Sequence, residues 1–250
     1  MNSERCRILE WDSHFFGRKI ARLEGSHLRA DELAGIEQWC ARERVECLYF
    51  LADSRCADTL AEVEAHGFGL KDIRMTYEWK AALGARGIHP EIGERVVVRE
   101  HRETDIERLV EVARAAHTDS RFFFDRQFDR DKAASLYERW IRKACAEDYV
   151  LVGEIDNLPA GYLSCAQSSA VSGSIGLAAV DSRFHGQGIG RAMIETALRW
   201  FTDRRIADIS VVTQGRNVAA HRFYQSAGFL TRGIECWFHK WFDSAPQLSS

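Results

Sequence analysis

The chain passes from strand to helix at Leu177-Ala-Ala-Val-Asp-Ser-Arg-Phe-His-Gly-Gln-Gly-Ile-Gly-Arg191. Gly186, Gly188 and Gly190 let the backbone turn so that several N–H groups point into one concavity. The positive end of the helix that follows adds to this field. We interpret the loop as a cradle for a diphosphate, with a purely structural strand-to-helix turn as the alternative.

The elements around this loop indicate an α+β fold. Apolar residues at helical spacing from Ile189 to Phe201 predict an amphipathic helix. Farther on, Asn217 is placed to cap a helix that ends at Gly228. Strands are predicted at Ile73–Trp79, Val96–Val98, Tyr149–Ile155, Gly161–Ala166, Ser174–Val180, Ile209–Thr213 and Glu235–Trp241.

Two further helices are predicted before these strands. A capping box, Thr104-Asp-Ile-Glu107, starts the first, and the second begins at about Asp131. The loop between them, residues 117–126, holds three consecutive aromatic residues beside two arginines. From residue 96 onward the order is β-α-α-β-β-β-α-β-α-β, which predicts a mixed, mostly antiparallel sheet flanked by helices.

A weak internal repeat divides the chain. The segments Leu48–Ala52 and Gly67-Phe68 match Ile209–Thr213 and Gly228-Phe229 at an offset of 161 residues. In the earlier copy Cys56 and Val63 stand at the positions of Asn217 and Tyr224, so this copy has lost the polar groups.

The stretch 84–95 is the best candidate for a domain boundary, because it holds three glycines and a proline. We therefore predict two domains, over residues 1–90 and 91–250.

Composition excludes several classes of protein. Of the 250 residues, 46% are hydrophobic and 28% charged, which is typical of one or two globular domains. The net charge of -3 provides no general attraction for nucleic acid or an anionic membrane. The seven cysteines are scattered and never spaced C-x-x-C, so neither a disulfide framework nor a zinc site is predicted. Without an apolar leader or a membrane span, we expect a cytoplasmic protein that needs no metal.

Two motifs together resemble the GNAT acyltransferase superfamily. The run from Leu177 to Met193 is similar to the family's acyl-CoA motif, with His185 where arginine or glutamine is usual. The second signature is Asn217-x-x-Ala-x-x-Phe-Tyr224-x-x-x-Gly-Phe229, at the expected separation. The resemblance implies a GNAT fold, acetyl-CoA as co-substrate and N-acetyl transfer. It makes residues 91–250 a catalytic GNAT domain and residues 1–90 a degenerate GNAT-like domain.

The resemblance also implies roles for individual residues. Tyr224 would protonate the departing coenzyme thiolate, and a backbone N–H near Leu177 would hold the thioester oxygen as negative charge grows on it. Residues expected to bind the coenzyme are Ala178, Val180, His185, Gly186, Gln187, Gly188, Ile189, Gly190, Arg191 and Asn217. The alternative is that Tyr224 is a core aromatic and Asn217 only a helix cap.

A narrower resemblance, to the two-domain TDP-fucosamine acetyltransferase group, rests on Ile8–Gly17 and Ser120-Arg-Phe122. It implies an acceptor amine on a nucleotide-linked amino-dideoxy sugar. Arginines in the 117–126 loop would grip its diphosphate, and aromatic side chains would pack on its rings. The residues expected to bind the acceptor are Arg121, Phe122, Asp125, Arg126 and Trp237.

Several points stay open at this level. The general base that deprotonates the amine is one of His117, Asp119, Asp125 and Glu78, or solvent. The acceptor amine belongs to an amino acid, a polyamine, an antibiotic or a protein terminus if the narrower resemblance misleads. A non-catalytic acyl-CoA-binding module is a further alternative. We expect a small-molecule partner, neither nucleic acid nor membrane, and leave a homodimer open.

Overall fold

A computed structural model describes residues 5–81 and 95–242. The order of elements predicted from residue 96 onward is confirmed, with one short helix, α5, added in the loop before α6. The helices are α1 (Glu10–Phe16), α2 (Ala30–Glu43), α3 (Ala57–Ala65), α4 (Ile106–Ala116), α5 (Arg121–Phe124), α6 (Arg130–Glu147), α7 (Ile189–Asp203) and α8 (Val218–Ser226). The strands are β1 (Cys6–Ile8), β2 (Ile20–Leu23), β3 (Cys47–Asp53), β4 (Gly69–Lys80), β5 (Val96–Glu100), β6 (Tyr149–Ile155), β7 (Leu158–Gln167), β8 (Ser172–Val180), β9 (Asp208–Gln214) and β10 (Leu230–Trp241).

The chain forms two compact units that are not continuous in sequence. The first unit takes the residues up to Arg74, Arg121–Lys132 and the residues from Ile234 onward; the second takes Met75–Ser120 and Ala133–Gly233. The segments 121–132 and 234–242 therefore lie in the first unit, although the sequence analysis assigned them to the second domain. Apart from Arg95, the predicted boundary at 84–95 lies outside the described residues, and the division at residue 90 stays a prediction.

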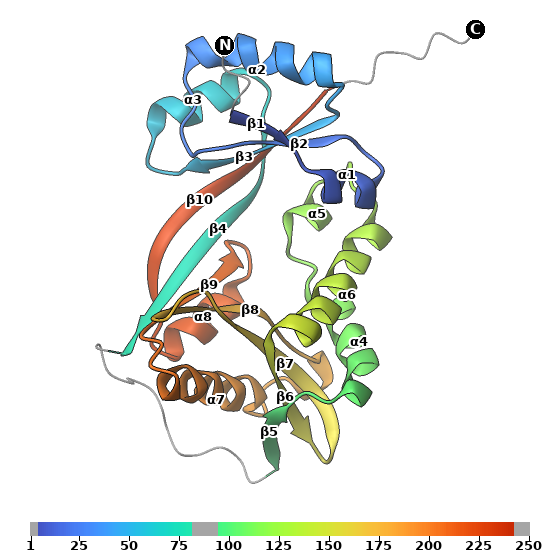
Figure 1. The fold of residues 1–250 in the computed structure, drawn as a ribbon, viewed down its shortest axis with the longest axis vertical. Helices are drawn as coiled ribbons and strands as arrows, with labels where there is room; N and C mark the ends of the chain where they lie inside the picture. Colours follow the sequence, from blue (N-terminus) through green and yellow to red (C-terminus); the bar gives the residue numbers. More distant parts are fainter. Residues whose placement is uncertain (1–4, 82–94, 243–250) are drawn as a thin grey trace, which may run out of the picture. The chain divides into compact units, whose positions relative to one another are not determined.

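In the second unit the strands lie in the order β9-β8-β7-β6-β5. Strands β8 and β9 pair in parallel, whereas β5–β6, β6–β7 and β7–β8 pair antiparallel, in agreement with the mixed, mostly antiparallel sheet that the sequence predicts. Helix α7 packs on β5 to β8, and its apolar face from Ile189 to Phe201 is buried in the main hydrophobic cluster. Figure 1 shows β6 and β7 between α7 and the pair α4 and α6. This arrangement covers both faces of the sheet beside the glycine loop.

The parallel pair β8–β9 opens toward the glycine loop. Its register ends at Ile175 and Val211, although β8 continues to Val180 and β9 to Gln214. At the same point β8 carries a bulge against β7, since the pairing shifts between Leu163 and Cys165. A bulge bends a strand and leaves one residue outside the regular ladder, so it re-aims the end of β8.

In the first unit the strands β1, β2, β3 and β10 are neighbours in that order. Strand β10 pairs antiparallel with β3 from Glu235–Asp53 to Trp241–Cys47. Helices α2 and α3 contribute Leu33, Ile36 and Val63 to a second buried hydrophobic cluster with β3. The unit therefore has a core of its own.

The predicted repeat appears as two β-α-β segments of equal length. Strand β3, helix α3 and strand β4 have 7, 9 and 12 residues, and so do β9, α8 and β10. Cys56 and Asn217 are the N-cap residues of the two helices. This match supports the interpretation that the two segments are copies.

The capping box predicted at Thr104-Asp-Ile-Glu107 is wrong. A 3-10 turn, Glu103–Asp105, precedes α4, and the Asp105 carboxylate accepts the backbone N–H of Arg102 at 2.7 Å. The Arg99 guanidinium also donates to this carboxylate, at 2.7 Å and 3.0 Å. The observed capping pair, Arg102 and Asp105, lies two residues before the predicted one. Among the described residues, no helix is both long and apolar enough to cross a membrane.

Candidate active site

A cavity of ≈ 820 Å³ lies in the second unit and brings together most of the residues expected to bind the coenzyme. Its volume is in the range of small-molecule sites in proteins. The predicted residues that line it are Ala178, Val180, His185, Gly186, Gly188, Ile189, Gly190, Arg191, Asn217 and Tyr224. Leu177 and Gln187 are not among the lining residues.

The glycine loop has a backbone that only glycine adopts without strain. Gly186 and Gly188 have φ of 77° and 83°, and a Cβ at either position would meet no atom within 4 Å. Gly188 is also the N-cap of α7, where the first N–H groups of the helix have no partner inside the helix. The loop thus combines open space, unpaired helix N–H groups and a helix dipole, which is what a phosphate requires.

The side chain of His185 serves the loop itself. Its Nε2 donates to the carbonyl oxygen of Val180 at 2.9 Å, so this bond closes the loop onto the end of β8. That nitrogen is therefore engaged within the protein, although His185 is one of the residues that line the cavity.

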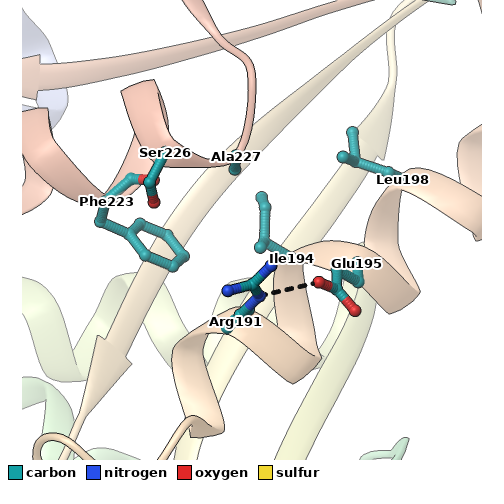
Figure 2. A pocket seen from close by; sticks show the side chains of 7 residues that line it. All are labelled: Arg191, Ile194, Glu195, Leu198, Phe223, Ser226 and Ala227. Carbon is teal, nitrogen blue, oxygen red and sulfur yellow. Dashed lines mark hydrogen bonds and ion pairs between the residues drawn. The ribbon is translucent and has the colours of Figure 1, made fainter. Parts of the chain in front are cut away.

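Arg191 lines both the large cavity and a smaller pocket between α7 and α8. Figure 2 shows Arg191 and Glu195 of α7 beside Phe223, Ser226 and Ala227. Arg191 Nε donates to Glu195 Oε1 at 3.0 Å, and Glu195 is 4% exposed. The small pocket has ≈ 20 Å³, about the room that one water molecule needs, so it cannot hold a substrate.

Helix α8 presents Asn217 and Tyr224 to the large cavity. Asn217 Oδ1 caps the helix by accepting the backbone N–H of Ala220 at 3.0 Å, which leaves its amide NH₂ for the cavity. Tyr224 is 6% exposed, and burial raises the pKa of its hydroxyl well above its ordinary value. The hydroxyl therefore stays protonated at neutral pH, the state in which it can donate a proton.

The backbone N–H of Leu177 is engaged in the structure. It donates to Ser164 Oγ at 2.9 Å, at the place where the bulge of β8 faces β7. A Cβ on Gly176 would approach the same oxygen to 2.7 Å, so the glycine admits the serine side chain.

A cluster of opposite charges that sequence reasoning missed lies beside the glycine loop. Asp181 forms ion pairs with Arg108 and Arg183, and all three residues line the cavity. Hydrogen bonds from Arg183 hold the pKa of Asp181 well below its ordinary value. Arg108 also pairs with Glu111, which lines the cavity as well, so two guanidinium groups and two carboxylates balance one another in charge. Arg108 lies 73 residues from Asp181, so no local pattern could have indicated it.

Of the candidates for the general base, only His117 lines the cavity. Its ring stacks on Tyr137 with the centroids 4.6 Å apart, and its Nε2 lies 2.8 Å from the hydroxyl oxygen of Tyr162. Burial lowers the pKa of His117 to about 4. Asp119 and Glu78 are also in the second unit but do not line the cavity.

The residues expected to bind the acceptor all belong to the first unit. Arg121 lies over the ring of Trp237, with its guanidinium carbon 4.1 Å from the ring centroid, and also over Tyr49 at 5.0 Å. Arg22 lies 5.4 Å from the same Trp237 ring and was not expected from the sequence. These contacts place the ring of Trp237 near two guanidinium groups.

Phe122 and Asp125 lie in the interior of the first unit. Phe122 is 3% exposed and packs on Phe16 and Phe128. The Asp125 carboxylate accepts from His239 Nδ1 at 2.7 Å and from Trp241 Nε1 at 2.9 Å. Burial alone would raise the pKa of Asp125, but these hydrogen bonds lower it to about 2.

No cluster of three histidine, cysteine or acidic side chains able to hold a metal occurs in the part of the chain that the structure describes. Arg126, the last predicted acceptor residue, is exposed on the first unit.

Comparison with known proteins finds a matching protein family and similar structures. The model of the Acetyltransferase (GNAT) family matches residues 109–229, which include the glycine loop, Asn217 and Tyr224. The structure of a GCN5-related N-acetyltransferase from Sphaerobacter thermophilus is similar, with a TM-score of 0.67 and 15% identity. The match covers 94% of this chain and 76% of that one. The predicted GNAT fold is confirmed.

Two curated relatives match part of the chain. It is 29% identical over 142 residues to a dTDP-fucosamine acetyltransferase of Escherichia coli O6:H1, covering 55% of this chain and 60% of that protein. It is 27% identical over 142 residues to the spore coat polysaccharide biosynthesis protein SpsD of Bacillus subtilis, covering 55% of this chain and 48% of that protein. The chain thus spans about half to three fifths of the length of these relatives.

Proposed function

Since residues 109–229 match the model of the Acetyltransferase (GNAT) family, we propose that the chain is a member of this family and transfers an acetyl group from acetyl-CoA to an amine. The observation that carries this proposal is one cavity shared by the glycine loop, Asn217 and Tyr224. A cradle for phosphate can bind the pyrophosphate of coenzyme A, and a protonated phenol in the same cavity can protonate the departing thiolate.

The coenzyme is held by main-chain groups in this proposal. Backbone N–H groups from Gln187 to Arg191 bind the pyrophosphate at the start of α7. The pantetheine arm lies along the end of β8 at Ala178 and Val180, where β8 has separated from β9. Asn217 turns its amide NH₂ toward the arm, because its Oδ1 is used by the helix cap.

The chemical step is direct attack in a ternary complex. The neutral amine adds to the thioester carbonyl, the C–S bond of the tetrahedral intermediate breaks, and the electron pair leaves with sulfur. Tyr224 gives its hydroxyl proton to that sulfur and recovers one from solvent, while the amine loses one proton to water. A fixed N–H donor at the thioester oxygen contributes about 10²- to 10³-fold in rate. We propose the main chain at Leu177 and Ala178 as this donor, with the Leu177 N–H exchanging Ser164 Oγ for the thioester oxygen.

The acceptor that we propose is the amine of a TDP-linked amino-dideoxy sugar. The name of the Escherichia coli relative supports it, as does the pair of guanidinium groups around Trp237. An aromatic ring and arginines are the side chains that bind a nucleotide base and a diphosphate. Arg22 and Arg121 are therefore the proposed diphosphate contacts, with Trp237 packing on a ring of the substrate.

The test is release of free coenzyme thiol from acetyl-CoA with a panel of amines: a TDP-4-amino-4,6-dideoxy sugar, an amino acid, a polyamine, an aminoglycoside and a peptide terminus. We expect turnover with the nucleotide sugar and inhibition by TDP. Turnover with another amine, without inhibition by TDP, would show that the acceptor is that amine and not a TDP-linked sugar. Calorimetry that detects no binding of coenzyme A would overturn the whole proposal, and coenzyme binding without thiol release would point to a binding module.

A further inference from the structure

His117 is held rigidly at the wall of the large cavity by three elements of the second unit. It follows the last residue of α4, its ring stacks on Tyr137 of α6 at an interplanar angle of 11°, and its Nε2 contacts the hydroxyl of Tyr162 on β7. The ring is therefore fixed in orientation as well as in place. Such a residue has a defined direction in which it can donate or accept a hydrogen bond.

The buried hydroxyl of Tyr162 determines which nitrogen of His117 carries the proton. Tyr162 is 0% exposed, and a buried hydroxyl donates to some acceptor in nearly all proteins. Among the described residues, the one hydrogen-bond partner of this hydroxyl is His117 Nε2, at 2.8 Å. Burial raises the pKa of Tyr162, so the hydroxyl keeps its proton. The hydroxyl therefore donates the hydrogen bond and Nε2 of His117 accepts it.

The proton of the neutral imidazole then sits on Nδ1. Burial lowers the pKa of His117 to about 4, so at neutral pH the ring carries one proton and no charge. With Nε2 accepting, that proton is on Nδ1. The described residues give Nδ1 no hydrogen-bond partner, and His117 lines the cavity.

We infer that the Nδ1–H of His117 donates a hydrogen bond to an oxygen of the acceptor substrate, and that Tyr162 fixes this polarity. This inference rests on the proposed function and narrows its substrate class: the acceptor carries a hydroxyl, ether or carbonyl oxygen near its amine. A simple alkylamine or polyamine has no oxygen to accept this bond, and its attacking nitrogen uses its lone pair on the thioester carbon. His117 is thereby a positioning residue for the acceptor, not the base that deprotonates the amine, because a base needs a lone pair facing the cavity.

The tautomer is measured directly, without substrate, by ¹⁵N NMR of the imidazole nitrogens at pH 7. The signal of His117 is assigned by its loss in His117→Asn. We expect a protonated Nδ1 and an unprotonated Nε2, and a mixture of tautomers in Tyr162→Phe, which lacks the hydroxyl donor. An Nε2–H tautomer or a doubly protonated ring in the wild type overturns the inference, whatever the substrate proves to be.

The role toward the acceptor is tested with TDP-4-amino-4,6-dideoxygalactose as the varied substrate. Asn places an amide NH₂ near the position of Nδ1 but offers no basic ring nitrogen, whereas Ala offers neither. We expect the KM for this amine to rise roughly tenfold in His117→Ala and to return to within about threefold of the wild type in His117→Asn. The KM for acetyl-CoA should stay unchanged in both variants.

The outcomes separate this inference from the proposed function. Failure of the proposed acceptor shows as absence of turnover by the wild-type protein. Failure of the inference shows as His117→Asn being as defective as His117→Ala, or as a fall in kcat with unchanged KM for the amine, both of which indicate a base. A rise in the KM for acetyl-CoA would assign the hydrogen bond to the coenzyme instead.

Discussion

At the scale of single residues, Tyr224 and Tyr77 form a natural comparison. Both are buried tyrosines of the second unit with ring centroids 6.3 Å apart, but only Tyr224 lines the large cavity. The hydroxyl of Tyr77 instead bonds to His221 Nδ1 at 2.7 Å. Substitution of Tyr224 and of Tyr77 in turn can therefore separate a role in proton transfer from a role in packing.

Removing the Tyr224 hydroxyl should slow the chemical step. We expect Tyr224→Phe to lower kcat about 10²-fold and to leave the KM for acetyl-CoA within about threefold, since general acid catalysis contributes at least this much. Steady-state release of coenzyme thiol measures both constants. Tyr77→Phe is the matched control and should keep the wild-type kcat; equal losses in the two variants would make Tyr224 a packing residue only.

Gly188 is predicted to be irreplaceable for coenzyme binding. A side chain at φ of 83° is strained, by roughly 1–2 kcal/mol, and its Cβ would stand in the open space that we assign to phosphate. We expect Gly188→Ala to weaken coenzyme A binding at least tenfold in calorimetry. Gly67, with φ of 73° and no atom near its Cβ, lies in the first unit, so Gly67→Ala should cost similar stability without loss of affinity.

At the scale of elements, the bulge in β8 is the feature on which the oxyanion proposal depends. Ser164 Oγ accepts the N–H of Leu177 there, and Ser164 is buried. A strand without this bulge would pair Leu177 regularly with β7 and leave no N–H to redirect.

The variant Ser164→Ala should separate stability from catalysis. Without the hydroxyl, the Leu177 N–H has no partner until substrate binds, so we expect unfolding in urea to show a loss of about 1–3 kcal/mol. The kcat should be equal to that of the wild type or higher, because the thioester oxygen no longer competes with Ser164. A fall in kcat of tenfold or more in the folded variant would mean that the Ser164 hydroxyl acts on the substrate itself.

The two β-α-β segments explain why a division of the chain by sequence is difficult. Strand β10 follows α8 of the second unit, yet from Glu235 onward it pairs with β3 of the first unit. Strand β4 follows α3 of the first unit, and its Tyr77 and Trp79 belong to the main hydrophobic cluster of the second. Each copy therefore gives the end of its last strand to the other unit.

At the scale of the whole molecule, each unit has, among its described residues, a histidine that burial keeps neutral at pH 7. Burial lowers the pKa of His117 in the second unit and of His239 in the first to about 4, from an ordinary value of 6.5. The unfolded chain binds these two protons at a higher pH than the folded one does. The folded state therefore has its full stability above about pH 6.5, and the part that depends on neutral histidines is lost as the pH falls from 6.5 toward 4.

We therefore expect the protein to lose stability on mild acidification, by on the order of 3 kcal/mol for each histidine between pH 7 and pH 4. Urea unfolding at a series of pH values measures this slope. His117→Asn and His239→Asn keep a donor near Nδ1 and remove the titration, so each should flatten the slope. A wild-type protein equally stable at pH 7 and pH 5 would contradict the prediction.

Local signals in the sequence determined the elements and the chemistry of the coenzyme side. The glycine loop, the helix cap at Asn217 and the position of Tyr224 two turns later depend on spacing within one segment, and such patterns are set by backbone geometry. This spacing made the resemblance to the GNAT family recognisable, and the resemblance implied roles for Asn217 and Tyr224 before the structure showed them lining the same cavity as the loop.

Only the tertiary structure decided which distant groups meet. The bond between His117 and Tyr162 joins residues 45 positions apart, and that between Asp125 and His239 joins residues 114 apart, so neither leaves a periodic trace. The burial of Asp125 and Phe122 and the two guanidinium groups at Trp237 likewise depend on how strands pair and helices pack. Contacts of this kind depend on the packing of the entire chain, because the free energy of bringing two side chains together is gained only once the core between them has formed.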